Sequence, residues 1–161
     1  MKRSGFLKRR TPLRSKTCIK RESPDDTAQC KKRIQALLRQ LAIQRDGGCV
    51  LRHYTDIAGR CGGYRGDGEL ILQAEHLNTR ARNISYGDMR NIVCLCSHHH
   101  GHWKPEHSRE YWKLIEQIIG PERQAWLDRI QADQRPYHMV LWDWQKLEME
   151  LRQQLKANEL I

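Results

Sequence analysis

The chain has 161 residues, of which 39% are hydrophobic and 30% charged, and a formal net charge of +10 at pH 7. This length predicts one domain with a modest core, a kind of domain that often relies on a bound metal. No segment approaches the roughly 20 consecutive apolar residues of a membrane-spanning helix, which argues against a membrane protein.

The first 22 residues are predicted to form a disordered basic arm. Nine lysines and arginines occur there, and no acidic residue precedes Glu22. Such a block is typical of a segment that binds a polyanion, with a solubilising tail as the alternative. No apolar run follows the basic residues, so we expect no signal peptide and a cytoplasmic location. Thiols stay reduced there, and six cysteines then favour metal binding over disulfides.

A helix is predicted between Ser23 and Gly47. Ser23 suits the N-cap, Pro24 suits the first helical position, and two glycines from Gly47 end the helix. Four apolar residues recur with helical spacing: Ile34, Leu37, Leu38 and Leu41. They give the helix one apolar face for packing.

The glycine-rich part of the chain from 49 to 96 is predicted to contain loops and short strands. "ELILQAEH" (69–76) predicts one strand, and "NIVCL" (91–95) predicts a second. The segment between them is a polar loop that carries Arg80, Arg82 and Arg90.

Helices are predicted after the histidine-rich segment. "SREYWKLIEQIIG" has one apolar side and stops at Gly120, and a short helix follows in "PERQAWLDRIQ". Residues 138–157 predict a longer helix with an apolar stripe of Val140, Trp144, Leu147, Leu151 and Leu155. Packing on the core is favoured for this stripe, with a dimer interface as the alternative. We therefore divide the chain into an arm (1–22), a core (23–120) and a helical extension (121–161).

The segment "NIVCLCSHHHGHW" (91–103) holds two cysteines and four histidines. Zinc binds four nitrogen or sulfur ligands in a tetrahedron, commonly supplied by two short pairs. Cys96 and His99 form one pair, and Cys49 and Cys61, each beside two glycines, form a longer one. We predict a structural zinc ion on Cys49, Cys61, Cys96 and His99.

Other assignments of the cysteines remain open. His53 could replace Cys61, and Cys94 is a further candidate, although we expect Cys94 and Cys96 to point apart. Cys18 and Cys30 are isolated and are interpreted as free thiols. A chain without any bound metal is the remaining alternative.

The run "AEH…RNIVCLCSHHHGHWK" resembles the motif of the HNH endonucleases, in which a histidine ends a strand, an asparagine follows, and a last histidine lies on a helix. His76, Asn91 and His100 match these positions. The resemblance implies an α+β fold, with a small zinc-stapled ββα-metal core flanked by N-terminal and C-terminal helices. It also implies hydrolysis of DNA phosphodiester bonds that leaves a 5′-phosphate.

The resemblance assigns roles to individual residues. His76 would be the general base, Glu75 and His100 would hold a catalytic Mg²⁺ or Mn²⁺ ion, and Asn91 would brace the loop that orients His76. His98 and His102 could bind metal but are expected to contact phosphate or solvent. Five basic residues are expected to contact the DNA backbone, which positions DNA without reading its sequence: Arg9, Arg10, Arg80, Arg82 and Lys104.

The layout of the whole chain is similar to that of phage recombination endonucleases of the lambda NinG (Rap) type. That resemblance implies a phage or prophage protein in the bacterial host cytoplasm, acting on branched DNA such as a Holliday junction. Cutting both strands calls for two active sites, so a homodimer is a further expectation. The long first cysteine pair and the glutamate before His76 depart from the usual pattern. A non-catalytic zinc-containing DNA-binding module and a sequence-specific homing or restriction HNH nuclease are the alternatives.

Overall fold

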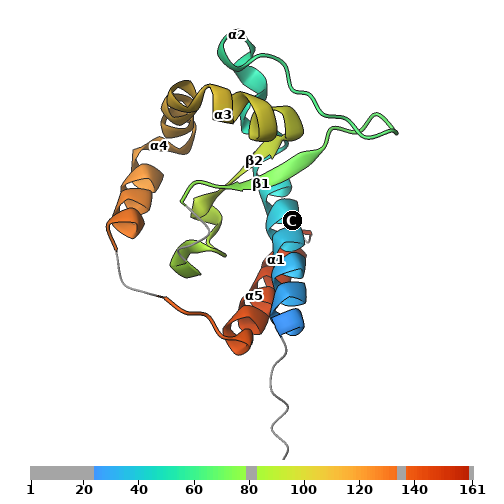
Figure 1. Cartoon of the computed structure of the whole chain (residues 1–161), viewed down its shortest axis with the longest axis vertical. Helices are drawn as coiled ribbons and strands as arrows, with labels where there is room; N and C mark the ends of the chain where they lie inside the picture. Colours follow the sequence, from blue (N-terminus) through green and yellow to red (C-terminus); the bar gives the residue numbers. More distant parts are fainter. Residues whose placement is uncertain (1–23, 79–82, 134–136, 160–161) are drawn as a thin grey trace, which may run out of the picture.

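The computed structural model describes residues 24–78, 83–133 and 137–159, drawn in colour in Figure 1. Four of the residues expected to contact DNA lie outside these ranges: Arg9, Arg10, Arg80 and Arg82. The predicted contacts of the arm and of the loop after His76 therefore remain predictions.

The described chain combines helices with one two-stranded antiparallel sheet, which confirms a mixed α+β fold. The helices are α1 (Pro24–Asp46), α2 (Thr55–Ala58), α3 (Lys104–Glu106), α4 (Ser108–Ala132) and α5 (Leu141–Glu159). The strands are β1 (Leu72–His76) and β2 (Ile92–Cys96). Four short helical turns connect them: η1 (Val50–His53), η2 (Asn83–Ser85), η3 (Met89–Asn91) and η4 (His99–Trp103).

Most predicted elements are present, with shifted ends. The first helix ends at Asp46, before the two glycines, as predicted. Strand β1 begins three residues later than predicted, at Leu72, because Leu70 makes only an isolated bridge to Tyr64. The predicted stop at Gly120 is a break inside α4, where Gly120 has a φ of 75°, and the chain resumes as helix directly after it.

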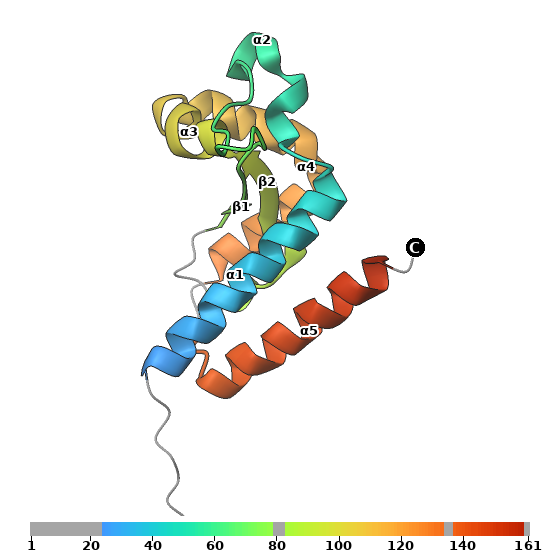
Figure 2. The same ribbon diagram turned by 90° about the vertical axis from the view of Figure 1, so that its right-hand side faces the viewer.

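Strand β2 is the central layer of the molecule. All five of its residues are buried. Ile92 and Cys94 pack into an apolar cluster with α1, while Val93 and Leu95 pack into a second cluster with α4. Figure 2 shows the sheet between these helices. A strand covered on both faces can be apolar throughout, which explains the continuous apolar run "IVCLC".

Side chains form hydrogen bonds with the backbone amide and carbonyl groups on the outer edge of β2. The Asp46 carboxylate accepts a hydrogen bond from the Cys94 amide at 2.8 Å. Arg45 and Arg123 donate to the Ile92 carbonyl oxygen at 2.6 and 2.5 Å. Unpaired strand edges tend to recruit further strands. These side chains satisfy the edge instead, so α1 ends directly against β2.

Helix α5 lies alongside α1, as Figure 2 shows. Trp144 and Leu151 are buried against α1, and Leu147 and Leu155 are partly buried beside them. The predicted packing of the stripe on the core is confirmed for these four residues. Because α1 covers Trp144 and Leu151, these two residues are not available to the alternative, a dimer interface along the stripe. Val140 lies before the helix and is 59% exposed.

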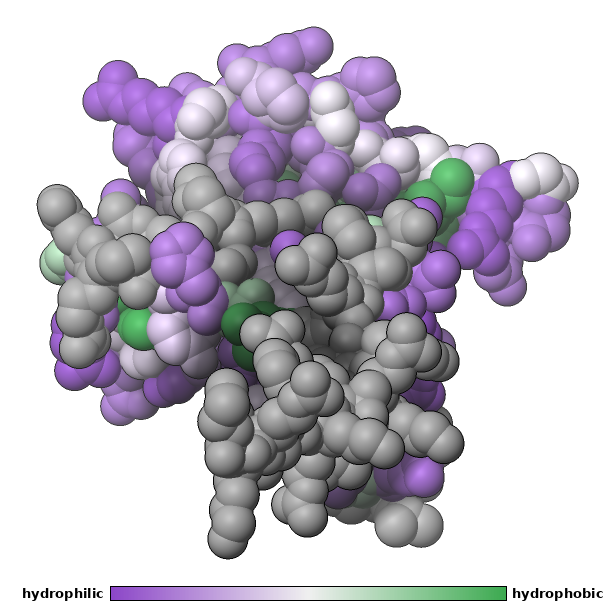
Figure 3. Space-filling view, turned by 60° about the horizontal axis from the view of Figure 1, so that its bottom comes forward, coloured by the Kyte–Doolittle hydropathy of each residue, from purple (hydrophilic) through white to green (hydrophobic). Residues whose placement is uncertain are grey.

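One face of the described chain is largely polar (Figure 3). On the face shown in Figure 3, the coloured residues are mostly hydrophilic and the apolar patches are small. No helix in the described part of the chain is long and apolar enough to cross a membrane.

A buried carboxylate joins α5 to α1. Glu148 is only 8% exposed and accepts hydrogen bonds from the Arg33 Nε at 2.9 and 3.0 Å. Arg152 and the Cys30 thiol also donate to it. The hydrogen bond from Arg33, together with those from Arg152 and Cys30, lowers the pKa of Glu148 from an ordinary 4.5 to about 2. The ionised carboxylate therefore stabilises the contact between the two helices.

The first prediction concerns this carboxylate. Replacing it, Glu148→Gln, should lower the free energy of unfolding by about 1 to 2 kcal/mol, because Arg33 loses its charged acceptor. Since folding depresses the pKa of Glu148, its contribution is complete above pH 4.5 and is lost as the pH falls toward 2. Urea unfolding at a series of pH values measures both effects.

Glu150 on the same helix provides the control. Its carboxylate lies 4.0 Å from Lys146, and both side chains are more than half exposed. Glu150→Gln should change the unfolding free energy by less than about 0.5 kcal/mol. Equal effects of the two substitutions would show that Glu148 does not join the helices in the way described.

Candidate metal centre

Three thiols and one imidazole meet next to the sheet. The ligand atoms of Cys49, Cys61, Cys96 and His99 all lie within 4.8 Å of one another. The His99 Nδ1 is 3.2 Å from the Cys49 and Cys96 sulfurs and 3.9 Å from the Cys61 sulfur. A tetrahedral zinc ion with its usual bond lengths separates sulfur and nitrogen ligands by about 3.5 Å. The four predicted side chains therefore form a cluster that could hold a structural metal such as zinc.

The cluster gathers residues from four places in the chain. Cys49 follows the glycines that end α1, Cys61 follows α2, Cys96 ends β2, and His99 begins the π-helical turn η4. Gly63 brings the Cys61 loop against the end of β2. Its φ is 84°, and a Cβ at this position would lie 2.5 Å from the Ser97 Cβ, so only glycine allows this approach.

A hydrogen bond fixes which nitrogen of His99 faces the thiols. The Nε2 lies 3.0 Å from the Ala58 carbonyl oxygen. A carbonyl can only accept, so Nε2 carries the proton and Nδ1 presents its lone pair to the three sulfurs. Metal-bound histidines are commonly oriented by such a hydrogen bond to the outer nitrogen. The donor set and its orientation both fit zinc.

Burial affects the protonation of the thiols. It raises the pKa values of Cys49 and Cys61, and burial also lowers the pKa of His99. Without a cation, the two thiols therefore stay protonated and the imidazole neutral at physiological pH. Metal binding requires thiolates, so a cation that binds here releases protons.

The alternative ligands lie elsewhere. His53 is exposed, and its Nε2 accepts a hydrogen bond from Arg52. Cys94 packs with α1, whereas Cys96 belongs to the cluster on the other side of β2. Side chains two residues apart in a regular strand point to the same face. Cys94 and Cys96 nevertheless lie in different clusters, because the strand ends at Cys96. Cys30 bonds to Glu148, and Cys18 lies outside the described residues.

A second polar group lies directly beside the cluster. The Glu75 carboxylate is 2.8 Å from the His100 Nε2, and the Lys104 ammonium contacts its other oxygen. Burial tends to raise the pKa of Glu75, but the hydrogen bonds from His100 and Lys104 outweigh burial and hold it below its usual value. The two residues predicted to hold a catalytic ion are thus in contact, and a lysine shares their carboxylate.

His76 ends β1 and is oriented by the loop that follows. Its Nε2 lies 3.0 Å from the Tyr86 carbonyl oxygen, which can only accept. Nε2 therefore carries the proton, and Nδ1 is the basic nitrogen of the ring. His76 is 8% exposed.

Asn91 makes hydrogen bonds to residues on both sides of the same loop. Its side-chain oxygen accepts from the Asn78 amide at 2.6 Å, and its Nδ2 donates to the Ser85 carbonyl at 3.1 Å. Asn91 is fully buried, and its backbone carbonyl also accepts from the Leu77 amide. One side chain thus holds both ends of the loop that leads from His76 to Tyr86.

The predicted site residues do not share one pocket. Neighbouring residues in a strand point to opposite faces, so Glu75 faces η4 and α3 while His76 faces α1. They approach each other only at the end of β1. Sequence analysis assigned Lys104 to DNA and missed its contact with Glu75, although its distance of four residues from His100 predicts a shared helix face.

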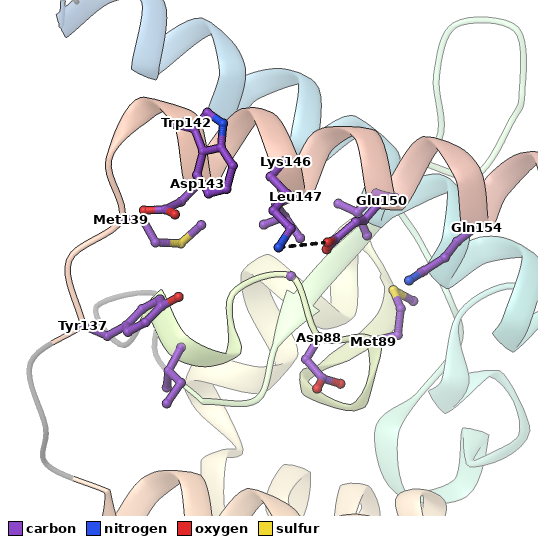
Figure 4. Close-up of a pocket in the computed structure, with 13 residues that line it drawn as sticks. Asp88, Met89, Tyr137, Met139, Trp142, Asp143, Lys146, Leu147, Glu150 and Gln154 are labelled. Atoms are coloured by element: carbon purple, nitrogen blue, oxygen red, sulfur yellow. Dashed lines mark ion pairs between the residues drawn. The ribbon is translucent and has the colours of Figure 1, made fainter.

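Another cavity lies between α5 and the loop before β2, with a volume of about 510 Å³ (Figure 4). Its acidic residues have structural partners: Asp88 pairs with Arg90, Glu150 pairs with Lys146, and Asp143 accepts from the Val140 amide. None of the predicted site residues lines this cavity. We therefore place the candidate site at the end of β1.

Comparison of the chain with protein-family models, curated protein sequences and solved structures finds no match.

The second prediction tests the metal cluster. The chain purified from cells should contain one zinc ion per chain by elemental analysis, and Cys96→Ser should reduce this content to near zero, because three ligands rarely retain a structural zinc. Replacing zinc with Co²⁺ should give the absorption of a tetrahedral thiolate site. The zinc-free variant should also unfold at a lower temperature.

Cys94 provides the matched control, since it lies two residues away and is fully buried. Cys94→Ala should keep the full zinc content. Loss of zinc from both variants would show that the metal depends on core packing instead of on these ligands.

Proposed function

We propose that the protein is a metal-dependent DNA endonuclease of the HNH type. The observation that supports this proposal best is the contact of Glu75 with His100 beside a strand-ending histidine that a carbonyl orients. A carboxylate and an imidazole form a donor set that suits Mn²⁺ or Mg²⁺. A divalent cation bound there would neutralise negative charge that develops on a phosphate.

The chain's own residues would divide the reaction between them. The His76 Nδ1 is buried and would take a proton from a water admitted to it when substrate binds, since the Tyr86 carbonyl holds the proton on Nε2. Asn91 would keep the loop and the imidazole in place through its hydrogen bonds. The attack of water on phosphorus would break the bond to the 3′ oxygen, leaving a 3′-hydroxyl and a 5′-phosphate.

Glu75 and His76 point to opposite faces of β1, and this arrangement constrains how DNA would bind. The sheet has only two strands, and side chains cap the outer edge of β2. A phosphate at the free edge of β1, next to its last residue, would lie within reach of both faces. We propose that the backbone of the substrate runs along this edge.

The structural metal cluster would position His100. His99 is held by the three thiols and by Ala58, and His100 is the next residue in the chain. In a helical turn, neighbouring side chains point in different directions that the backbone fixes relative to each other. Zinc on His99 would therefore fix the direction of His100 toward Glu75.

Branched DNA is the proposed substrate class. The net charge of +10 and the basic residues of the arm suit a substrate that presents many phosphates. Coordinated cuts in two strands would require two copies of the chain, joined through a surface other than the α5 stripe, which α1 covers.

A non-catalytic zinc-containing DNA-binding module is the second candidate, because the thiol cluster can stabilise the fold without any hydrolysis. In that case Lys104 would neutralise Glu75 permanently.

The third prediction separates these candidates. With Mg²⁺, the wild-type chain should cut an end-labelled four-way junction more efficiently than a linear duplex of the same sequence, and EDTA should stop the reaction. His76→Ala should slow cleavage at least about 100-fold, because proton transfer by a positioned base contributes roughly that much. Single-turnover rates on gels measure the effect.

His102→Ala is the control, because it also removes one imidazole, from an exposed histidine of the segment 91–103. It should cut at close to the wild-type rate. If the wild-type chain binds the junction but never cuts it with any divalent ion, the binding module is the correct function. Equal cleavage of duplex and junction at one sequence would favour the homing or restriction alternative.

The fourth prediction concerns Lys104. Its ammonium occupies the Glu75 oxygen that a divalent ion would need, so Lys104→Met should raise the affinity for Mn²⁺ several-fold. Electron paramagnetic resonance of free Mn²⁺ measures the affinity without DNA or catalysis. The control is Glu75→Gln, which should remove this binding in either background. An unchanged or weaker affinity of Lys104→Met would show that lysine and metal do not compete.

A further inference from the structure

The His76 imidazole opens into a cavity that belongs to neither metal site. The cavity has a volume of about 260 Å³ and lies between α1 and β1. The strand contributes Leu72, Ala74 and His76, which share one face, and the helix contributes Gln35 and Arg39. Helix α1 therefore brings an amide and a guanidinium to the same cavity as the proposed base.

Gln35 has a structural partner in this cavity. Its Nε2 donates to the Tyr86 hydroxyl at 3.2 Å. The backbone carbonyl of Tyr86 is the group that orients His76, and the two rings lie 5.0 Å apart. Gln35 thus ties α1 to the residue that holds the base.

Arg39 differs from three other arginines that contact the packed elements. Arg33 has the Glu148 carboxylate, and Arg45 and Arg123 have carbonyl oxygens of the β2 edge. The Arg39 Nε is buried and has no hydrogen-bond partner within residues 24–78, 83–133 and 137–159. Leaving such a donor unsatisfied is costly, and a ligand that brings an acceptor into the cavity would satisfy it.

We propose that Arg39 binds a phosphate of the nucleic acid strand from the α1 side of β1, opposite the face that carries Glu75. This inference rests on the proposed function, since it places Arg39 beside the nucleic acid strand that the water activated by His76 would attack. A guanidinium suits the non-bridging oxygens of a phosphodiester, which it can bind through two parallel hydrogen bonds. The strand would then be held on both faces of β1, by Arg39 on one side and by the cation site on the other.

Binding measured without catalysis tests the proposal. A fluorescein-labelled four-way junction is titrated with the full chain in EDTA, and anisotropy gives Kd at several salt concentrations. Arg39→Met should weaken binding about ten-fold and reduce the slope of log Kd against log salt by about one, as expected when one phosphate contact is lost. Arg39→Lys keeps the charge and should keep most of the slope.

Lys32 on the same helix is exposed and does not line the cavity, so Lys32→Met controls for general loss of positive charge. It should change the affinity and slope less than Arg39→Met does. Thermal unfolding of each variant identifies a merely structural role. If Arg39→Met lowers the unfolding temperature but binds the junction with the wild-type slope, the proposal is wrong. Should Arg39→Met fail to fold, Arg39→Gln takes its place and the same two outcomes decide.

Cleavage in Mg²⁺ separates this proposal from the proposed function. If the wild-type chain cuts DNA and Arg39→Met cuts and binds equally well, the nuclease proposal stands and the Arg39 contact is overturned. If the wild-type chain never cuts but Arg39→Met loses the phosphate contact, the inference holds for a binding protein and the nuclease proposal fails.

Discussion

The meeting of three thiols and one imidazole is the constraint on which the other features of this structure depend. The described chain has a two-stranded sheet and modest apolar clusters, and the four side chains act together with hydrogen bonds from the Ser97 and His98 amides to the Ile71 and Gly62 carbonyls to fix the loop from 49 to 71 against the start of η4. Within the cluster, the hydrogen bond from His99 to Ala58 determines which ring nitrogen faces the sulfurs. Because His99 and His100 are adjacent, the position of His100 follows from the same constraint.

The arrangement around β1 follows from the alternation of a strand. Glu75 and His76 are neighbours in sequence, and the strand therefore sends them to opposite layers of the molecule. Glu75 meets the helical turn that the thiols position, and His76 meets the loop that Asn91 closes. A substrate that needs both side chains has to lie where the two faces meet, at the end and free edge of β1.

Much of this architecture follows from local sequence signals. The first helix was predictable because its start, its end and its apolar spacing agree. In the thiol and imidazole cluster, Cys96 and His99 were predictable from their knuckle spacing, and the more widely spaced Cys49 and Cys61 from their neighbouring glycines. The β2 strand was predictable from its apolar run, but its first residue was not, since the buried turn at Asn91 looks equally extended in sequence. Short-range patterns thus identify elements better than their ends.

These local patterns do not predict hydrogen-bond partners that lie far apart in the sequence. Nothing local to Asp46 indicates that its carboxylate accepts from the Cys94 amide, 48 residues away, or that Arg123 reaches the Ile92 carbonyl. The cavity that joins Arg39 to His76 likewise exists only because α1 crosses β1. Such contacts depend on how the layers pack, and spacing along one element cannot reveal them.

These contacts show which of the positive charges have partners inside the protein. A net charge of +10 by itself indicates only attraction to polyanions. Within the described residues, however, several cations serve the fold: Arg33 binds Glu148, and Arg45 and Arg123 cap β2. These arginines donate hydrogen bonds to acceptors inside the protein, and binding DNA through the same donors would break those hydrogen bonds. The buried Arg39 Nε has no such acceptor among the described residues, so a phosphate bound by Arg39 would not displace a partner of that nitrogen.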